Sequence, residues 1–279
     1  MIFDSHSHTV FSADSEMKAA DALAAAEKAG LGLVFTEHLD LDYPGTTDFT
    51  FDPVEYWRQY ELLRGRQLRL GVEVGMQGST ADRSRAFVEK VPFDLVIGSI
   101  HMVDGQDIYY KEAYGTESKE VFFAKYYQQM EQNIRQHDFI DVLGHIDYIA
   151  RYAPYDNPEI QYGVFADAID AVLQAAVETN TVLELNTRRM GSRIAIKELI
   201  PVYARYRELG GRQVTLGSDA HTADAVGNYF QEAREVADVL GLHIVTFVGR
   251  RMVKCWVCLR WQHENEIINS VRCKMKLNI

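Results

Sequence analysis

The stretch DSHSHT at residues 4–9 places two histidines, His6 and His8, one residue apart after an apolar pair, Ile2 and Phe3. We expect residues 2–8 to form a β-strand, and on a strand the side chains of residues i and i+2 point to the same side. Two imidazoles on one face of a strand can hold a metal ion between them. A His-x-His match this short also arises by chance, so the rest of the chain decides its meaning.

Short apolar runs alternate with longer helical patterns along most of the chain. Further strands are expected at 32–38, 68–75, 94–102, 141–148, 181–187 and 213–221, and helices at 17–29, 53–64, 84–91, 119–137, 165–179, 195–209 and 229–240. Seven successive strand–helix units predict an α/β protein with a parallel sheet. The continuous apolar character of the strands indicates that both faces of the sheet are covered. We therefore predict one closed or nearly closed barrel, in which the long loops at about 103–118 and 149–163 carry functional residues.

The composition is that of a soluble globular protein. The 279 residues are 47% hydrophobic and 25% charged, and no apolar run reaches the roughly 18 residues of a membrane helix. The first residues lack the pattern of a signal peptide, so we expect a cytoplasmic protein without a membrane partner. The net charge of -11 argues against binding to nucleic acid. The oligomeric state is left open.

Imidazoles and carboxylates recur at the ends of the other expected strands. The side chains concerned are His38, Glu73, His101, His145, Asp219 and His221. Because the carboxyl ends of the strands in a parallel barrel meet at one rim, these side chains would converge with His6 and His8. The three other histidines, His137, His243 and His263, lie away from the rim, and we interpret them as ordinary structural residues.

The residue types at the rim indicate a metal site. Glu73 lies inside an apolar run, and a buried carboxylate is costly unless a cation or a proton neutralises it. Imidazoles and carboxylates without thiolates suit Zn, Mn or Fe. Eight or nine ligands are too many for one ion, so we expect two to three divalent ions. Asp14 taken alone is more typical of a helix cap.

The motifs DSHSHT, FTEH, GVEVG, GSIHMV, GHIDYIARY, LELNT and GSDAH follow one another over residues 1–249. In this order they resemble the PHP (polymerase and histidinol phosphatase) superfamily, and most of all its histidinol-phosphate phosphatase branch. The resemblance implies a seven-stranded distorted (β/α) TIM-like barrel with three metal ions. By resemblance, the first ion is bound by His6, His8, Glu73 and Asp219, the second by Glu73, His101 and His145, and the third by Asp14, His38 and His221.

The resemblance also implies the activity. We expect a metal-dependent phosphomonoesterase that hydrolyses L-histidinol phosphate to L-histidinol and phosphate, a reaction of histidine biosynthesis, with Glu73, Asp219 and His221 as the residues that carry catalysis. Metal ions would neutralise the phosphoryl oxygens and activate the attacking water. The guanidinium fork matches phosphate, and Arg151, Arg188 and Arg189 follow two of the expected strands, with Arg193 as a further candidate.

The acidic loop after the second expected strand contains Glu37, Asp40 and Asp42. One of these carboxylates could bind the cationic amine of histidinol phosphate. A solvated surface loop explains the same residues, and we favour that interpretation.

Other functions fit parts of the pattern. A PHP phosphoesterase could act on another small phosphate ester, on a nucleotide or DNA end, or on phosphotyrosine, although the net charge of -16 over residues 1–249 speaks against DNA. Amide hydrolases of the barrel type also use His-x-His, but they commonly recruit a lysine, and no lysine stands at these strand ends. A metal-storing or regulatory domain would tolerate loss of ligands, whereas here the full set is present.

The end of the chain differs in kind from the rest. Residues 250–279 carry seven Lys or Arg and two Glu, a net charge of +5, and all three cysteines lie at or after position 255. We predict a phosphatase barrel over residues 1–253 and a basic, cysteine-containing tail over residues 254–279. The group Cys255, Cys258, Cys273 and His263 could form a small zinc site, but its spacing matches no strong template, and we favour an extension that lies outside the active site.

Overall fold

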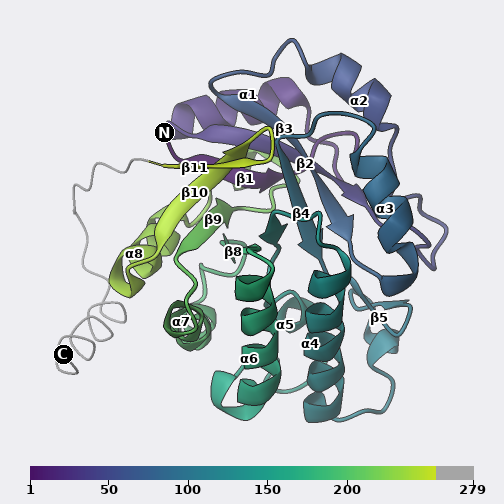
Figure 1. Ribbon diagram of the computed structural model, residues 1–279, viewed down its shortest axis with the longest axis vertical. Helices are drawn as coiled ribbons and strands as arrows, with labels where there is room; N and C mark the ends of the chain where they lie inside the picture. Colours follow the sequence, from purple (N-terminus) through teal and green to yellow (C-terminus); the bar gives the residue numbers. More distant parts are fainter. Residues whose placement is uncertain (256–279) are drawn as a thin grey trace.

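The computed structural model describes residues 1–255. They form an α/β fold in which helices pack around one large, mostly parallel sheet (Figure 1). The predicted fold class, with its parallel sheet, is therefore confirmed. In order along the sheet, the strands are β1 (Phe3–Ser7), β2 (Gly32–Leu39), β3 (Leu68–Gly75), β4 (Leu95–Ser99), β7 (Val142–Leu143), β8 (Val182–Asn186), β9 (Gln213–Gly217), β10 (His243–Val248) and β11 (Arg251–Lys254).

The predicted strand count of seven is wrong, because the main sheet has nine strands. β10 pairs with β9 in parallel, and β11 turns back antiparallel to β10. The buried side chains of Val245 and Phe247 explain why β10 joins the sheet. The turn after β10 is held by Asp94, whose Oδ1 accepts a hydrogen bond from the backbone N–H of Gly249 at 2.8 Å. A separate two-stranded sheet consists of β5 (Met102–Val103) and β6 (Gln106–Asp107).

The helices begin and end at residues suited to those positions. Asp52 accepts hydrogen bonds from the first backbone N–H groups of α2, which starts with a proline. Gly30 ends α1 at a φ of 69°, in the left-handed region that favours glycine. The helices are α1 (Ala19–Ala29), α2 (Pro53–Tyr60), α3 (Ala81–Val88), α4 (Lys119–Gln136), α5 (Ile149–Tyr152), α6 (Tyr162–Glu178), α7 (Arg193–Glu208) and α8 (Phe230–Leu240), with 3-10 turns η1 (Gly78–Thr80), η2 (Lys111–Tyr114) and η3 (Ala223–Ala225).

Two apolar cores lie on opposite sides of the strands. The larger core fills the space between the sheet and the helices, of which α4 and α7 both pack against α6 (Figure 1). The smaller core joins side chains from six strands; its members are Phe3, Val34, Leu95, Ile97, Val142, Val182, Val245 and Phe247. The strands are thus covered on both faces, as their continuous apolar sequences indicate.

The start of the chain lies beside the segment that follows β9. Ser7 and Ala220 form a parallel bridge, flanked by a hydrogen bond from the N–H of Asp219 to the carbonyl of His6 at 2.9 Å. The N–H of His8 donates to the carbonyl of Ala220 at 2.8 Å. The DSHSHT stretch therefore lies next to GSDAH, although more than two hundred residues separate them.

Within residues 1–255, none of the helices combines the length and the apolar character that crossing a membrane requires.

Candidate metal centre

The carboxyl ends of the parallel strands gather the predicted rim residues at one place. His38 and Glu73 are register partners on β2 and β3. His8, His101 and His145 follow the ends of β1, β4 and β7, and Asp219 and His221 follow β9. His38 and Glu73 thus lie on the strands, whereas the other five residues lie in the segments directly after the strands. The six rim histidines, with His6 on β1, therefore lie close together in the structure, as their strand positions led us to expect.

Glu73 lies at the centre of the cluster and is fully buried. Its Oε2 is 3.0 Å from His38 Nδ1 and 3.2 Å from His6 Nε2. Its Oε1 is 2.9 Å from His145 Nε2 and 3.3 Å from His101 Nε2, and it also accepts a hydrogen bond from the Ser99 hydroxyl at 2.6 Å. One carboxylate thus faces imidazoles from four different segments of the chain.

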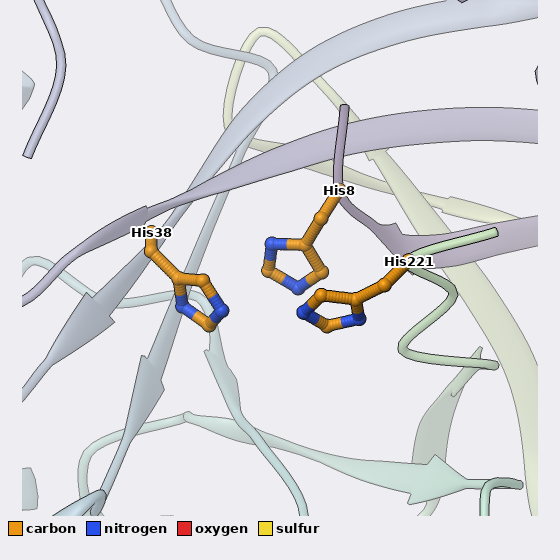
Figure 2. A group of neighbouring side chains, drawn as sticks. All are labelled: His8, His38 and His221. Carbon is orange, nitrogen blue, oxygen red and sulfur yellow. The ribbon is translucent and has the colours of Figure 1, made fainter. Parts of the chain in front are cut away.

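His8 and His221 add two further imidazoles, which stack in one group with His38. Figure 2 shows His8 between His38 and His221, with the rings turned toward one another. The ring centroids of His8 and His38 are 4.1 Å apart, and those of His8 and His221 are 4.3 Å apart. One nitrogen from each of the three rings lies within 4.8 Å of the others, so the group could hold a metal ion.

The two aspartates complete the set. Asp14 Oδ2 is 3.2 Å from His221 Nε2 and 3.5 Å from His38 Nε2, so Asp14 faces the same group rather than capping a helix. Asp219 Oδ1 is 3.4 Å from His8 Nε2 and 3.8 Å from His6 Nε2. Asp219 has a φ of 55°, a left-handed conformation that is uncommon outside glycine, and its backbone hydrogen bond to His6 supports it.

The residues present fit divalent metal ions. His6 Nε2, His8 Nε2, His38 Nδ1 and Glu73 Oε2 are buried and make no hydrogen bond, although buried polar atoms normally find a partner. Burial disfavours a charge on His6, yet the carboxylates of Glu184, Glu73 and Asp219 outweigh burial and raise its pKa well above the usual range. The carboxylates around His6 therefore favour a positive charge at this position, which a bound cation would supply.

Four overlapping groups have their ligand atoms close enough for an ion. They are His6, His8 and Asp219; His6, Glu73 and His145; His38, Asp40 and His101; and His8, His38 and His221. Asp40 was expected as a loop residue, but it is buried and its Oδ1 lies 2.8 Å from His101 Nδ1.

Neither of the other two acidic residues lines the cavity, and the interpretation as a solvated loop is wrong for Glu37, which lies on β2. Glu37 is buried behind His8 and accepts hydrogen bonds from Ser12 and Thr9. Asp42 is exposed and pairs with Arg83 at 3.0 Å. Neither carboxylate is placed to meet the amine of a substrate.

The predicted arginines separate into two kinds. Arg151 and Arg188 line the cavity, and both bind Asp219, Arg151 through the carboxylate at 2.5 Å and Arg188 through the backbone carbonyl at 2.7 Å. Arg189 does not line the cavity. Its guanidinium is held by Asp147 at 3.1 Å and by Glu159 at 2.6 Å, so the structure does not support the expectation that it binds phosphate. Arg193 is the first residue of α7.

A cavity of about 350 Å³ opens over the cluster. The residues of its wall that the sequence did not single out are mainly aromatic, and they include Tyr43, Phe49, Tyr109, Tyr110, Tyr148 and Tyr152. The two long loops supply Tyr109, Tyr110 and Tyr152, together with Asp107, whose carboxylate accepts a hydrogen bond from Tyr43 at 2.8 Å. The expectation that these loops carry functional residues agrees with their place in the cavity wall.

Two of the three histidines expected away from the rim, His137 and His243, lie outside the cavity wall. His137 is buried after α4, and His243 begins β10 at the surface. His263, Cys258 and Cys273, with most of the predicted tail, lie outside the described residues. Cys255 is described, and its backbone N–H donates to the carbonyl of Ile244 at 3.0 Å.

A parallel α/β fold with clustered imidazoles and carboxylates at the carboxyl ends of its strands defines a protein with a metal-capable site. The chain belongs to the PHP domain family, whose family model matches residues 4–188. The predicted resemblance to this family is confirmed.

The chain is also similar to individual proteins of known or probable function. It is 43% identical over 252 residues to a probable histidinol-phosphatase of Clostridium acetobutylicum, which covers 90% of this chain and 99% of that protein. It is 29% identical over 259 residues to the histidinol-phosphatase of Lactococcus lactis, covering 90% and 96%. The crystal structure of histidinol phosphate phosphatase from Lactococcus lactis, complexed with Zn, L-histidinol and phosphate, matches with a TM-score of 0.86 at 29% identity, over 91% of this chain and 99% of that one.

Proposed function

We propose that this chain is a metal-dependent phosphomonoesterase that hydrolyses L-histidinol phosphate to L-histidinol and phosphate. One observation carries the proposal: a single cavity joins the imidazole–carboxylate cluster, the two arginines and a mouth of aromatic and acidic side chains. The similarity to histidinol-phosphatases over nine-tenths of the chain supports the same substrate. An enzyme of this type would work in the cytoplasm.

Two to three divalent ions, of Zn, Mn or Fe, would be held by the cluster. His6, His8, Glu73 and Asp219 would hold one; Glu73, His101 and His145 a second; and Asp14, His38 and His221 a third. The contacts around Glu73 support its role as the shared ligand, because both of its oxygens face imidazoles. Such ions supply charge neutralisation for the phosphoryl oxygens and lower the pKa of water toward about 7.

Arg151 and Arg188 would bind the phosphate from the side of β8 and β9. The side chain of Arg151 is 6% exposed. Although burial lowers its pKa, the neighbouring carboxylates of Asp219 and Asp147 outweigh burial and raise the pKa, so the guanidinium stays charged. Its Nε is buried and makes no hydrogen bond, which leaves a donor for a phosphoryl oxygen. Glu73, Asp219 and His221 would support catalysis by holding the charges around the reacting phosphate in place.

The remaining wall of the cavity suits the histidinol part of the substrate. Tyr148 packs at 5.1 Å from the His101 ring and at 5.4 Å from Tyr152, so a flat imidazole would meet aromatic faces beside the metal cluster. Asp107 and Asp40 line the same cavity and would attract the substrate ammonium group. A simple phosphate ester without ring or amine would use neither feature.

The finer architecture follows the same proposal. The seven parallel strands from β1 to β9 would form a distorted (β/α) barrel, which the bridge between Ser7 and Ala220 and the core shared by six strands support. The predicted domain of residues 1–253 would be the phosphatase domain, extended to Cys255 by the pairing of Lys254 in β11 and the backbone hydrogen bond of Cys255. The rest of the predicted tail, 254–279, would be separate from it.

The proposal is tested by measuring kcat/KM for phosphate release from a panel of esters with the purified metal-loaded protein. The panel contains L-histidinol phosphate, p-nitrophenyl phosphate, a nucleoside monophosphate and a phosphotyrosine peptide. We expect L-histidinol phosphate to exceed each other ester by at least two orders of magnitude. Equal or higher kcat/KM for any other ester would contradict the substrate assignment.

A further inference from the structure

Glu184 and Asn186 lie two residues apart on β8, so their side chains point to the same side of the strand. Both are buried, and neither forms part of the cavity wall. They belong to the LELNT motif, for which the proposed chemistry has no role. Their hydrogen bonds nevertheless reach both the proposed metal ligands and the proposed phosphate-binding arginines.

Glu184 binds two of the proposed metal ligands. Its Oε1 lies 2.7 Å from Nδ1 of His6, and its Oε2 accepts a hydrogen bond from the backbone N–H of His145 at 2.7 Å. Carboxylate oxygens accept hydrogen bonds, so we assign the hydrogen of this contact to Nδ1 of His6. The other ring nitrogen, Nε2, then faces Glu73 Oε2 at 3.2 Å.

Asn186 contacts the two arginines that are proposed to bind phosphate. Its Nδ2 donates to Glu184 Oε2 at 3.1 Å, which turns its Oδ1 in the opposite direction. That oxygen accepts hydrogen bonds from Nη2 of Arg151 at 2.9 Å and from the backbone N–H of Arg188 at 3.1 Å. Glu184 therefore fixes the orientation of the Asn186 amide, and the amide oxygen in turn holds the Arg151 side chain and the Arg188 backbone.

We propose that Glu184 and Asn186 are a pair of positioning residues, in which Glu184 orients His6 toward a metal ion and Asn186 orients Arg151 toward phosphate. A carboxylate behind a metal-bound imidazole fixes the ring and raises its basicity as a ligand. An acceptor behind a guanidinium restricts the rotation of a long side chain before phosphate arrives. The arm that concerns Asn186 rests on the proposed phosphatase function, whereas the arm that concerns Glu184 needs only metal binding.

The Glu184 arm is tested with Zn alone. Glu184→Gln keeps the size of the side chain, but all its partners are donors, so the new amide NH2 must face one of them. Competition with a chromophoric chelator should show Zn binding at the tightest site weakened by roughly 10- to 100-fold. Glu235→Gln, at a buried glutamate on α8, is the matched control and should bind Zn like the unaltered protein.

Glu184→Asp is measured in parallel, because it keeps the charge but is one methylene too short to reach both His6 and His145. Circular dichroism and a thermal melt establish that each variant is folded. If Glu184→Gln does not fold, Glu184→Asp decides the question. A folded Glu184 variant with unaltered Zn affinity, or an equal loss in Glu235→Gln, would overturn the role of Glu184.

The Asn186 arm is tested by calorimetric binding of inorganic phosphate to the metal-loaded protein, and by KM for L-histidinol phosphate. Asn186→Leu should weaken phosphate binding and raise KM by about 10- to 100-fold, with bound metal unchanged. Asn133→Leu, at a buried asparagine on α4, is the control and should leave both values unaltered. Unaltered phosphate binding in Asn186→Leu, or an equal loss in the control, would overturn the role of Asn186.

The two kinds of failure are distinguishable. If the unaltered protein binds phosphate but does not hydrolyse L-histidinol phosphate, the proposed substrate is wrong, while Zn affinity and phosphate binding still decide the roles of Glu184 and Asn186.

Discussion

Arg151 donates a hydrogen bond from Nη1 to Oδ2 of Asp219 at 2.5 Å. This contact joins a proposed phosphate-binding side chain to a proposed metal ligand. Asp219 directs its other carboxylate oxygen toward His8 and His6, so one aspartate stands between the arginine and the imidazoles. We infer that the Asp219 side chain fixes the position of Arg151 relative to the metal-ligand imidazoles of His6 and His8.

The first prediction concerns the two kinds of arginine. Arg151→Ala should raise KM and the inhibition constant of inorganic phosphate together, by roughly 10- to 150-fold, because one hydrogen bond to a charged group contributes about 1.5–3 kcal/mol. Arg151→Lys should restore only part of the loss, since lysine lacks the planar fork. Steady-state kinetics with phosphate as inhibitor give both constants.

Arg189→Ala is the matched control for this prediction. The Arg189 guanidinium is already engaged by Asp147 and Glu159 outside the cavity, so its removal should leave phosphate inhibition unchanged. The interpretation of the cavity fails if Arg189→Ala weakens phosphate inhibition as much as Arg151→Ala does.

The second prediction concerns Glu73. Because both of its oxygens face imidazoles, Glu73→Gln should remove more than one metal ion and lower activity by several orders of magnitude. Asp14→Asn, at a carboxylate that faces only His38 and His221, should cost less metal. Elemental analysis after gel filtration gives the stoichiometry. Full metal loading of folded Glu73→Gln would exclude a shared ligand.

The third prediction concerns the pH dependence of stability. Burial lowers the pKa of His137, despite the hydrogen bond that its Nδ1 shares with the Asn133 carbonyl. The folded protein therefore keeps His137 neutral, whereas in the unfolded chain it gains a proton below about pH 6.5. Its contribution to stability is present above that pH and is lost as the pH falls toward the folded pKa.

The comparison with His137→Asn isolates this contribution from the acid-linked loss of metal. Urea unfolding should show the difference in unfolding free energy between the unaltered protein and the variant shrinking between about pH 7.5 and pH 5.5. A difference that stays constant over this range would show that His137 does not titrate as described.

The fourth prediction concerns the end of the chain. β11 runs to Lys254, and Cys255 still donates a backbone hydrogen bond to Ile244. A chain that ends at Cys255 should therefore keep its bound metal and its turnover, because all proposed ligands lie at or before His221. Metal analysis and kinetics of the truncated chain provide the check. A folded truncated chain that loses metal or activity would assign the tail a part in the site.

The sequence predicted the site better than the outline of the sheet. Strand ends in a parallel sheet meet at one edge, so the positions of His38, Glu73 and His101 along the chain were enough to bring them together. The strand count was wrong because β10 follows the last strand–helix unit, and its membership depends on packing of Val245 and Phe247 and on the contact of Gly249 with Asp94, which the local pattern does not contain.

The supporting residues of the site could not be read from the sequence. Arg151 and Arg189 both follow predicted strands, and only the positions of Asp147 and Glu159 show that Arg189 is occupied elsewhere. Half of the aromatic wall comes from the long loops, which have no periodicity, so Tyr109 and Tyr152 give no signal of their own. Glu184 lies inside an apolar run, as Glu73 does. A carboxylate in such a run was the one sequence feature that indicated a role for Glu184.

The most direct test of the central claim is the initial rate of phosphate release from L-histidinol phosphate by chelator-treated protein, before and after Zn or Mn is added back. The account predicts no turnover without metal, because the cluster of His6, His8, Glu73 and Asp219 would then lack the charge that phosphate requires, and recovery of turnover in proportion to the metal restored. Sustained turnover in protein shown by elemental analysis to be free of metal would contradict it, as would a fully metal-loaded protein that releases no phosphate from this substrate.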